Sequence, residues 1–244
     1  MAEPVVAYYD ARWGYRDFDA RRYEERRYGS FGRRLNHRLL ERALTRGLAD
    51  VAPGSIVLDA PCGTGILTGL LHRLGYRTLG ADIGPAMLGV ARTRGQDLGL
   101  VRADLEQPPL CDGSVDAVVS ARFLMHLPPA LRPSVLRAMA ATARGPVVAT
   151  VCHPYTLKSA LRAVRRMLGF AAKKSPRLTR RELAAEAEAA GLVLERVIPV
   201  LPILSEVWVI VLRQKENTCQ RSNPSVAARS STRAASPPSR PPSS

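Results

Sequence analysis

The sequence predicts an α/β fold: a doubly wound, mostly parallel sheet of seven strands with helices on both faces and a C-terminal antiparallel hairpin. Three observations support this fold. Apolar runs of strand length alternate with runs of helical periodicity along most of the chain. The run Ile56 to Leu58 leads directly into a glycine-rich turn that opens a helix. The last two strand-like runs are joined only by residues 201–205, which is too short for a crossover helix, so these strands must pair antiparallel.

The elements follow in order. Leu and Ala recur at helical spacing over 35–48, which predicts an amphipathic helix packed on the sheet. Strands are expected near 55–59, 76–81, 98–102, 115–120, 146–152, 192–200 and 206–213. Helices are expected near 66–74, 85–94, 129–143 and 156–170. A last helix is expected to begin after Thr179 as N-cap and to stop at Gly191.

The length of 244 residues suits one domain with extensions. We expect an N-terminal segment at 1–34, a domain at 35–213 with a basic helical insertion at 153–178, and a tail at 214–244. The N-terminal segment is rich in Tyr and Arg, which suits either a lid over a ligand or simple helix packing. The tail holds eight Ser and five Pro in 31 residues, which predicts disorder.

The net charge of +15 is uneven. Residues 158–181 hold nine Lys or Arg and no acid, and residues 12–42 hold ten Arg against five acids, so the rest of the domain is not basic. Within the basic segment Leu157, Leu161, Val164 and Leu168 form one stripe. Such a helix suits weak contact with an anionic membrane surface, or a lid helix whose basic face is solvated.

The cysteines at 62, 111, 152 and 219 are widely spaced and form neither a zinc pair nor a disulfide framework. No metal is therefore expected, and free cysteines suit a reducing cytosol. No apolar run is long enough to cross a bilayer, and the first residues lack the apolar stretch of a signal peptide. We expect a cytoplasmic protein.

The glycine turn predicts a nucleotide site, because glycines let a ligand approach the backbone at a helix N-terminus. Asp82 lies about 20 residues beyond the turn at the end of the next strand, where a carboxylate can bind the two hydroxyls of a ribose. Two cofactor classes fit this pattern. The dinucleotide fingerprint requires a glycine where this chain has Thr68, and it does not include Asp59.

The run Asp59-Ala-Pro-Cys-Gly-Thr-Gly65 resembles the first motif of the class I S-adenosylmethionine (SAM)-dependent methyltransferases. Residues 82–87, 102–105 and 114–127 resemble the second, third and fourth motifs, and the resemblance covers roughly 35–213. It implies a Rossmann-like fold, SAM as cofactor, and the small-molecule type 11 or type 25 members as the nearest group. Pro61 departs from the pattern because the family usually has glycine there, so the turn should be stiffer.

The resemblance also implies a role for individual residues. Asp59 should orient the turn and accept from the amino end of SAM, Asp82 should accept from the ribose, and Asp104 should face the adenine. The implied cofactor-binding residues are Asp59, Cys62, Gly63, Gly65, Asp82, Ile83, Met87, Asp104, Leu105, Ser120 and Arg122. The alternative for the carboxylates is capping of their own loops.

Three residues near the expected carboxyl edge of the sheet are candidates for catalysis. His126 follows the fourth strand but lies in an apolar run, so it is either a base or part of the scaffold. His153 and Tyr155 follow the fifth strand and could touch the acceptor.

The leading interpretation is methyl transfer to oxygen or carbon of a quinone-like, lipid-like or secondary-metabolite acceptor. A nucleic-acid methyltransferase is the second, although no Asn-Pro-Pro-Tyr or Asp-Pro-Pro-Tyr follows the fourth strand, and we expect no specific nucleic-acid partner. A non-catalytic SAM-binding module is the third, since the motifs specify only the cofactor. A dehydrogenase is the fourth, disfavoured by Thr68 and the terminal hairpin. The sequence predicts neither the acceptor's identity nor the oligomeric state.

Overall fold

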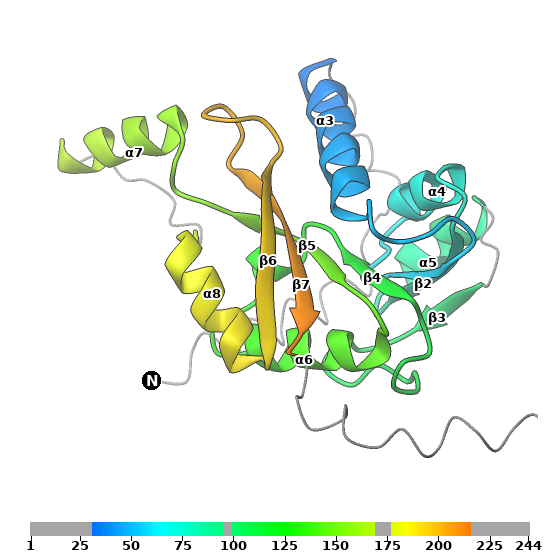
Figure 1. Ribbon diagram of the computed structural model, residues 1–244. Helices are drawn as coiled ribbons and strands as arrows, with labels where there is room; N and C mark the ends of the chain where they lie inside the picture. Colours follow the sequence, from blue (N-terminus) through cyan, green and yellow to red (C-terminus); the bar gives the residue numbers. More distant parts are fainter. Residues whose placement is uncertain (1–30, 95–98, 169–176, 216–244) are drawn as a thin grey trace, which may run out of the picture. The chain divides into compact units, whose positions relative to one another are not determined.

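The computed structural model describes residues 31–94, 99–168 and 177–215 (Figure 1). Residues 1–30 of the predicted N-terminal segment, part of the basic insertion and almost all of the tail lie outside these residues, and the predicted domain limits stay predictions. The strands are β1 (Ile56–Asp59), β2 (Arg77–Asp82), β3 (Leu100–Arg102), β4 (Ala117–Ser120), β5 (Val147–Cys152), β6 (Leu192–Pro199) and β7 (Val207–Gln214). The helices are α3 (Phe31–Gly47), α4 (Ile66–Arg73), α5 (Pro85–Arg92), η2 (Leu124–His126), α6 (Arg132–Thr142), α7 (Leu157–Met167) and α8 (Arg180–Ala189).

The seven strands form one sheet in the order β3-β2-β1-β4-β5-β7-β6. Neighbouring strands among β1 to β5 pair in parallel, whereas β7 pairs antiparallel with both β5 and β6. This topology confirms the predicted doubly wound sheet with its terminal hairpin. The chain winds outward in one direction from β1 to β3 and in the other from β4, so the order reverses between β1 and β4.

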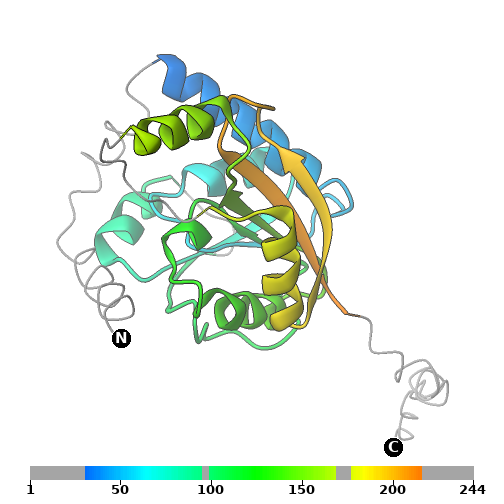
Figure 2. The ribbon, with the colours of Figure 1, turned by 90° about the vertical axis from the view of Figure 1, so that its left-hand side faces the viewer.

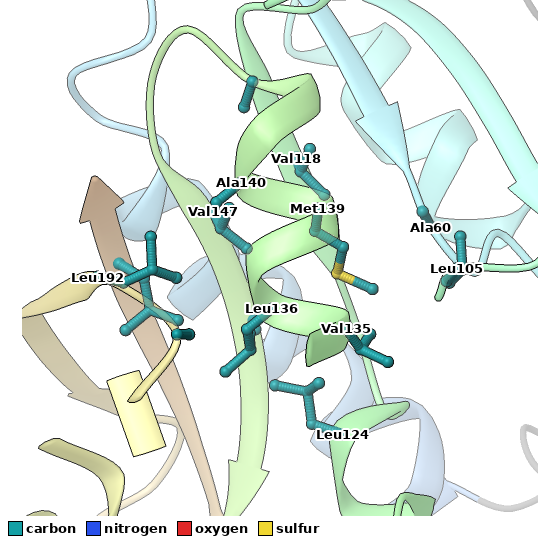
Figure 3. Close-up of a cluster of buried hydrophobic side chains, with 14 of the residues drawn as sticks. Ala60, Leu105, Val118, Leu124, Val135, Leu136, Met139, Ala140, Val147 and Leu192 are labelled. Atoms are coloured by element: carbon teal, nitrogen blue, oxygen red, sulfur yellow. The ribbon is translucent and has the colours of Figure 1, made fainter. Parts of the chain in front are cut away.

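Alternate strand residues point to opposite faces and bury two apolar layers. On one face, Val57 and Val119 pack with the leucines of α3 and α4. On the other face, Leu58 and Val118 pack with α6 and α8. Figure 3 shows part of this second layer, in which Val118 and Val147 of the sheet lie beside Met139 and Ala140 of α6.

The ends of the helices follow local chemistry. Thr179 and Glu182 form the capping box that starts α8: the Thr179 hydroxyl accepts from the Glu182 amide at 3.2 Å, and the Glu182 carboxylate accepts from the Thr179 amide at 2.7 Å. Gly191, just beyond the end of α8, has a φ of 77°, a conformation that ends the helix as predicted. Helix α6 begins at Arg132, later than the predicted 129, with Pro133 in its first turn.

A buried ion pair joins α6 to α8. Arg132 is 2% exposed, and its guanidinium donates to the Glu186 carboxylate at 2.7 Å and to the Leu127 carbonyl at 3.2 Å. Burial raises the pKa of Glu186, although Arg132 opposes the rise. The pair therefore fixes how these two helices lie against the sheet.

Candidate cofactor site

The site lies where the order of the strands reverses. In open α/β sheets, ligands bind outside the carboxyl ends of the strands at this point. Strand β1 ends at Asp59, β2 at Asp82 and β4 at Ser120. All three are almost fully buried, with exposed fractions of 0%, 7% and 0%. Three polar side chains that the sequence pattern singled out thus lie at one edge of the sheet.

The turn after β1 holds the two glycines in conformations that favour glycine. Gly63 has a φ of 54° and Gly65, the N-cap of α4, has a φ of 79°. A Cβ atom added to Gly63 would meet nothing within 4 Å, so the turn is open at this residue. No side chain caps α4, which leaves its first amides directed toward the turn. A ligand with polar groups can therefore approach the backbone here.

Asp82 links the turn to the end of β2. One carboxylate oxygen accepts from the Gly63 amide at 2.9 Å, and the other accepts from the Gly84 amide at 2.7 Å. Burial raises the pKa of Asp82, although these amides oppose the rise. The Gly84 bond is the loop capping that a carboxylate in this position would make without any ligand. A carboxylate has about four acceptor positions, however, so Asp82 keeps capacity for further donors.

Asp59 is fully buried and only partly satisfied. Its Oδ2 accepts from the Thr68 hydroxyl at 2.7 Å, whereas its Oδ1 has no partner among the described residues. Burial raises the pKa of Asp59 to about 7; the Thr68 bond opposes the rise and the nearby Asp82 adds to it. A buried acceptor without a donor calls for an explanation, and a ligand with a cationic donor would supply one.

Thr68 is a site residue that the sequence interpretation missed. Its position served only to exclude a dinucleotide fingerprint, but its side chain is 1% exposed and holds the Asp59 carboxylate from the buried face of α4. The available signal was a hydroxyl residue on the apolar face of a helix directly after the turn. Such a residue needs a partner when it is buried.

Cys62 of the turn and Met87 of the second motif are buried beneath the turn, whereas Ile83 is not. Cys62 is 6% exposed, its amide donates to the Ala81 carbonyl at 2.8 Å, and burial raises the pKa of its thiol. A Cβ added to Gly80 would lie 3.1 Å from the Cys62 sulfur, so Cys62 fills the space between the turn and β2. Met87 is buried at 4%, while Ile83 is partly exposed.

The third motif follows β3. Asp104 is partly exposed, and its carboxylate accepts from the Glu106 amide at 3.1 Å, which shapes the loop. Leu105 is buried at 6% and packs in the layer below α6 and α8. Arg102 donates to the Ile83 carbonyl at 3.3 Å and joins this loop to the end of β2.

The end of β4 contains a second unsatisfied polar atom. The hydroxyl of the fully buried Ser120 has no partner among the described residues. Arg122, two residues on, has a φ of 58°, which costs a residue with a Cβ roughly 1–2 kcal/mol. The Arg122 amide donates to the hydroxyl of the buried Thr150, which holds this conformation in place. Strained backbone of this kind clusters at functional sites.

The three candidate catalytic residues lie in different environments. His126 ends η2 and is exposed. His153 is 3% exposed; its Nδ1 accepts from the Tyr155 amide at 3.1 Å, the Ser205 backbone hydrogen-bonds to its ring, and burial lowers its pKa. Tyr155 is 56% exposed. Of these two histidines, His126 therefore has better access to solvent.

Trp208 is a further residue that the motifs did not reveal. Its ring stacks on His153 with centroids 4.2 Å apart and on Tyr155 with centroids 5.6 Å apart. Because Val151 pairs with Trp208 across β5 and β7, the hairpin brings this ring beside the residues that follow β5. The rings of His153, Tyr155 and Trp208 thus form one stack at the carboxyl edge of the sheet.

This arrangement fits SAM. The unsatisfied Asp59 oxygen suits a cationic amino group, the Asp82 carboxylate suits ribose hydroxyls, and the open Gly63 gives a ligand access to the backbone. Within residues 31–94, 99–168 and 177–215, no group of three or more His, Cys, Asp or Glu could hold a metal ion. No helix in this part of the chain is long and apolar enough to cross a membrane.

Comparisons with known proteins agree with this geometry. A family model described as a methyltransferase domain matches residues 58–145. The malonyl-[acyl-carrier protein] O-methyltransferase of Serratia marcescens is 36% identical over 88 residues, which is 35% of this chain and 34% of that protein. The ubiquinone biosynthesis O-methyltransferase of Nitrosococcus oceani is 40% identical over 81 residues, which is 31% of this chain and 34% of that protein.

These curated relatives match only in part, since the alignment spans about a third of their length. The fold similarity is broader. The magnesium protoporphyrin IX methyltransferase of Synechocystis, crystallised with S-adenosylhomocysteine bound, has a TM-score of 0.66 at 20% identity and covers 85% of this chain and 99% of its own. Residues 58–145 are thus similar to methyltransferase domains, and the described part of the chain shares the fold of a SAM-dependent methyltransferase that was crystallised with its cofactor product.

Proposed function

We propose that the chain transfers a methyl group from SAM to an oxygen or carbon atom of a small-molecule acceptor. One observation carries this proposal: two buried carboxylates, Asp59 and Asp82, flank an open glycine turn, and one of them has an acceptor atom without a donor. SAM carries a cationic amino group and a ribose, and a methyltransferase needs a site that binds both.

SAM supplies the reactive methyl carbon and the sulfur leaving group, so the protein mainly orients the reactants and excludes water. Asp82 would accept from the ribose while it keeps its bonds to the Gly63 and Gly84 amides. Asp59 would accept from the amino end, with its carboxylate held by Thr68. Asp104 and Ile83 would border the adenine, since both are partly exposed beside the end of β2.

The raised pKa of Asp59 couples cofactor binding to pH. Near pH 7 the carboxyl is partly protonated, and a cationic amino group would favour the ionised form. Binding should therefore release a proton below about pH 7, and the affinity for SAM should rise as the pH increases through that value. If SAM bound to the glycine turn without contacting Asp59, its affinity would not show this pH dependence.

A general base is needed only if the acceptor atom must lose its proton. His126 is the candidate, because it is exposed and follows the strand that ends at Ser120. His153 fits a structural role better, since backbone groups bind both sides of its ring and Trp208 stacks on it. Tyr155, at the exposed end of the same ring stack, would touch the acceptor rather than move a proton.

The names of the relatives favour an apolar or acyl acceptor. By name, they are a malonyl-[acyl-carrier protein] O-methyltransferase, a ubiquinone biosynthesis O-methyltransferase and a demethylmenaquinone methyltransferase. We infer a quinone-like or lipid-like acceptor for this chain, a cytoplasmic location, and weak contact of 158–181 with an anionic membrane. The alternatives are methylation of RNA and SAM binding without catalysis. An activity assay would distinguish each of them from methylation of a small molecule.

The test is incubation of the purified chain with SAM and a lipid extract, followed by mass spectrometry. The proposal expects products heavier by one methylene unit, with S-adenosylhomocysteine formed in equal amount. An Asp59→Ala, Asp82→Ala double variant is the control and should form neither. Tight SAM binding without any product from lipid, metabolite or RNA fractions would favour the non-catalytic alternative.

A further inference from the structure

The large apolar side chains exposed in the described part of the chain are concentrated in two segments. Of nine such residues, seven lie in 155–168 and 203–204. The first segment contains Tyr155, Leu157, Leu161, Met167 and Leu168, and the second contains Ile203 and Leu204. Each is more than half exposed. We name these seven residues the apolar edge face.

The two segments are neighbours in space. The Leu157 amide donates to the Ile203 carbonyl at 3.2 Å, which joins the start of α7 to the loop between β6 and β7. Arg162 of α7 binds Glu206, which directly precedes β7, at 2.5 Å. Figures 1 and 2 both draw α7 beside this loop. The face is therefore one surface, made by a helix and a hairpin loop.

The apolar stripe of α7 points outward. Leu157 and Leu161 are one helical turn apart, and both are more than half exposed, at 58% and 57%. A helix normally turns such a stripe toward the core of its own domain. Ile203 has a φ of 67°, a strained value for a β-branched residue, and this turn presents Ile203 and Leu204 at exposed fractions of 67% and 66%. Grouped apolar exposure of this kind marks an interaction surface.

The charge around the face selects the partner. Residues 158–181 hold nine basic residues and no acid, and Arg165, Arg180 and Arg181 are exposed. Among the described residues, Glu206 lies beside α7, and Arg162 and Arg177 bind its carboxylate. We propose that the apolar edge face docks on an anionic lipid bilayer, with its leucines in the acyl boundary and its basic residues among the headgroups.

The position of the face gives this docking a consequence. Cys152, the last residue of β5, pairs with Val207, the first residue of β7, so the face lies at the carboxyl edge of the sheet, as the cofactor site does. If the proposed function holds, a bilayer docked here can supply an acceptor dissolved in lipid. The docking itself does not depend on methyl transfer and can be tested without it.

The test is sedimentation of the full chain with phosphatidylcholine vesicles, with and without about a quarter of phosphatidylglycerol. The proposal expects binding to the anionic vesicles that weakens as salt is added. Replacing Leu157 and Leu161 together by Ser should lower the partition coefficient at least about tenfold, equivalent to about 1.4 kcal/mol. Replacing Arg165 and Arg166 by Gln should lower it roughly fivefold for each charge.

Matched control residues lie at the other ends of the strands, away from the apolar edge face. Val193, near the start of β6, is 47% exposed, and Arg77 at the start of β2 is also exposed. Val193→Ser and Arg77→Gln should leave vesicle binding unchanged. Circular dichroism and calorimetric SAM titration of every variant separate this proposal from the proposed function, because the Leu157, Leu161 variant should keep its fold and its SAM affinity.

Several outcomes would overturn the docking proposal. One is vesicle binding that is equal in the parent and the Leu157, Leu161 variant. A second is a stable dimer in sedimentation velocity that dissociates in this variant, because the face would then bind a second copy of the chain. A third is retention of RNA but not of anionic vesicles at physiological salt.

Discussion

Asp59→Asn should remove a large part of the pH dependence of stability. Burial raises the pKa of this carboxyl from 3.8 to about 7. The folded protein therefore binds a proton that the unfolded chain releases between about pH 4 and pH 7, and stability falls as the pH rises through this interval. The difference corresponds to about 4 kcal/mol in total, or about 1.4 kcal/mol for each pH unit.

The variant preserves shape while it removes the titration. The amide oxygen of Asn can still accept from the Thr68 hydroxyl, as the Asp59 carboxylate does. The new amide hydrogens add a cost that does not vary with pH, so the slope is the informative quantity. Asp82 is present in both proteins, and because it adds to the pKa rise of Asp59, the comparison measures Asp59 together with this coupling.

The assay is urea unfolding of parent and variant, without SAM, at several pH values from 4.5 to 7.5, an interval chosen to span the titration of Asp59. The free energy of unfolding of the parent should fall more steeply with pH, and the gap between the two proteins should shift in favour of the variant by about 3 kcal/mol over this interval. Asp112→Asn, at an exposed carboxyl, is the matched control for the change from Asp to Asn itself. Equal slopes in parent and Asp59→Asn would refute the claim that Asp59 is buried in a protonatable form.

Further substitutions test other parts of the account. Thr68→Val should destabilise the chain by about 1.5–3 kcal/mol when Asp59 is ionised, because a charged acceptor loses its donor, and by less at low pH; urea unfolding at two pH values measures the difference. Glu186→Ala should cost about 3–5 kcal/mol, because it leaves the buried Arg132 without its carboxylate, and an equal loss in an Arg132→Met, Glu186→Leu double variant would contradict this reason. His126→Asn should reduce turnover while it preserves SAM affinity, and unchanged turnover would assign His126 to the scaffold.

The sequence predicted the sheet because its signal is local. Each strand is a short apolar run, and the connection through residues 201–205 decides the direction of the last strand. All seven predicted strands are present, and the terminal hairpin is confirmed. The ends of the elements shifted by a few residues, as α6 shows, because capping and proline geometry decide them rather than apolar periodicity.

Much of the site's chemistry depends on contacts that no local pattern encodes. The Thr68 bond to Asp59 requires α4 to pack back on β1, and the ring stack of His153 on Trp208 requires the register of β5 and β7. The stripe of α7 was predicted, but the sequence left open whether a pocket, solvent or a membrane meets it. Its exposure follows from the way the Leu157 amide and Arg162 tether the helix to the β6–β7 loop.

The glycine turn at residues 60–65, flanked by Asp59 and Asp82, is proposed to bind SAM. Isothermal titration of the purified chain with SAM, S-adenosylhomocysteine and NAD tests this proposal most directly, with Asp82→Ala as the variant and Asp50→Ala as the control. The account predicts binding of the first two ligands and none of NAD. It also predicts a loss of about 1.5–3 kcal/mol in Asp82→Ala, because the ribose hydroxyls lose a charged acceptor. Binding of NAD, or unchanged SAM affinity in a folded Asp82→Ala variant, would contradict it.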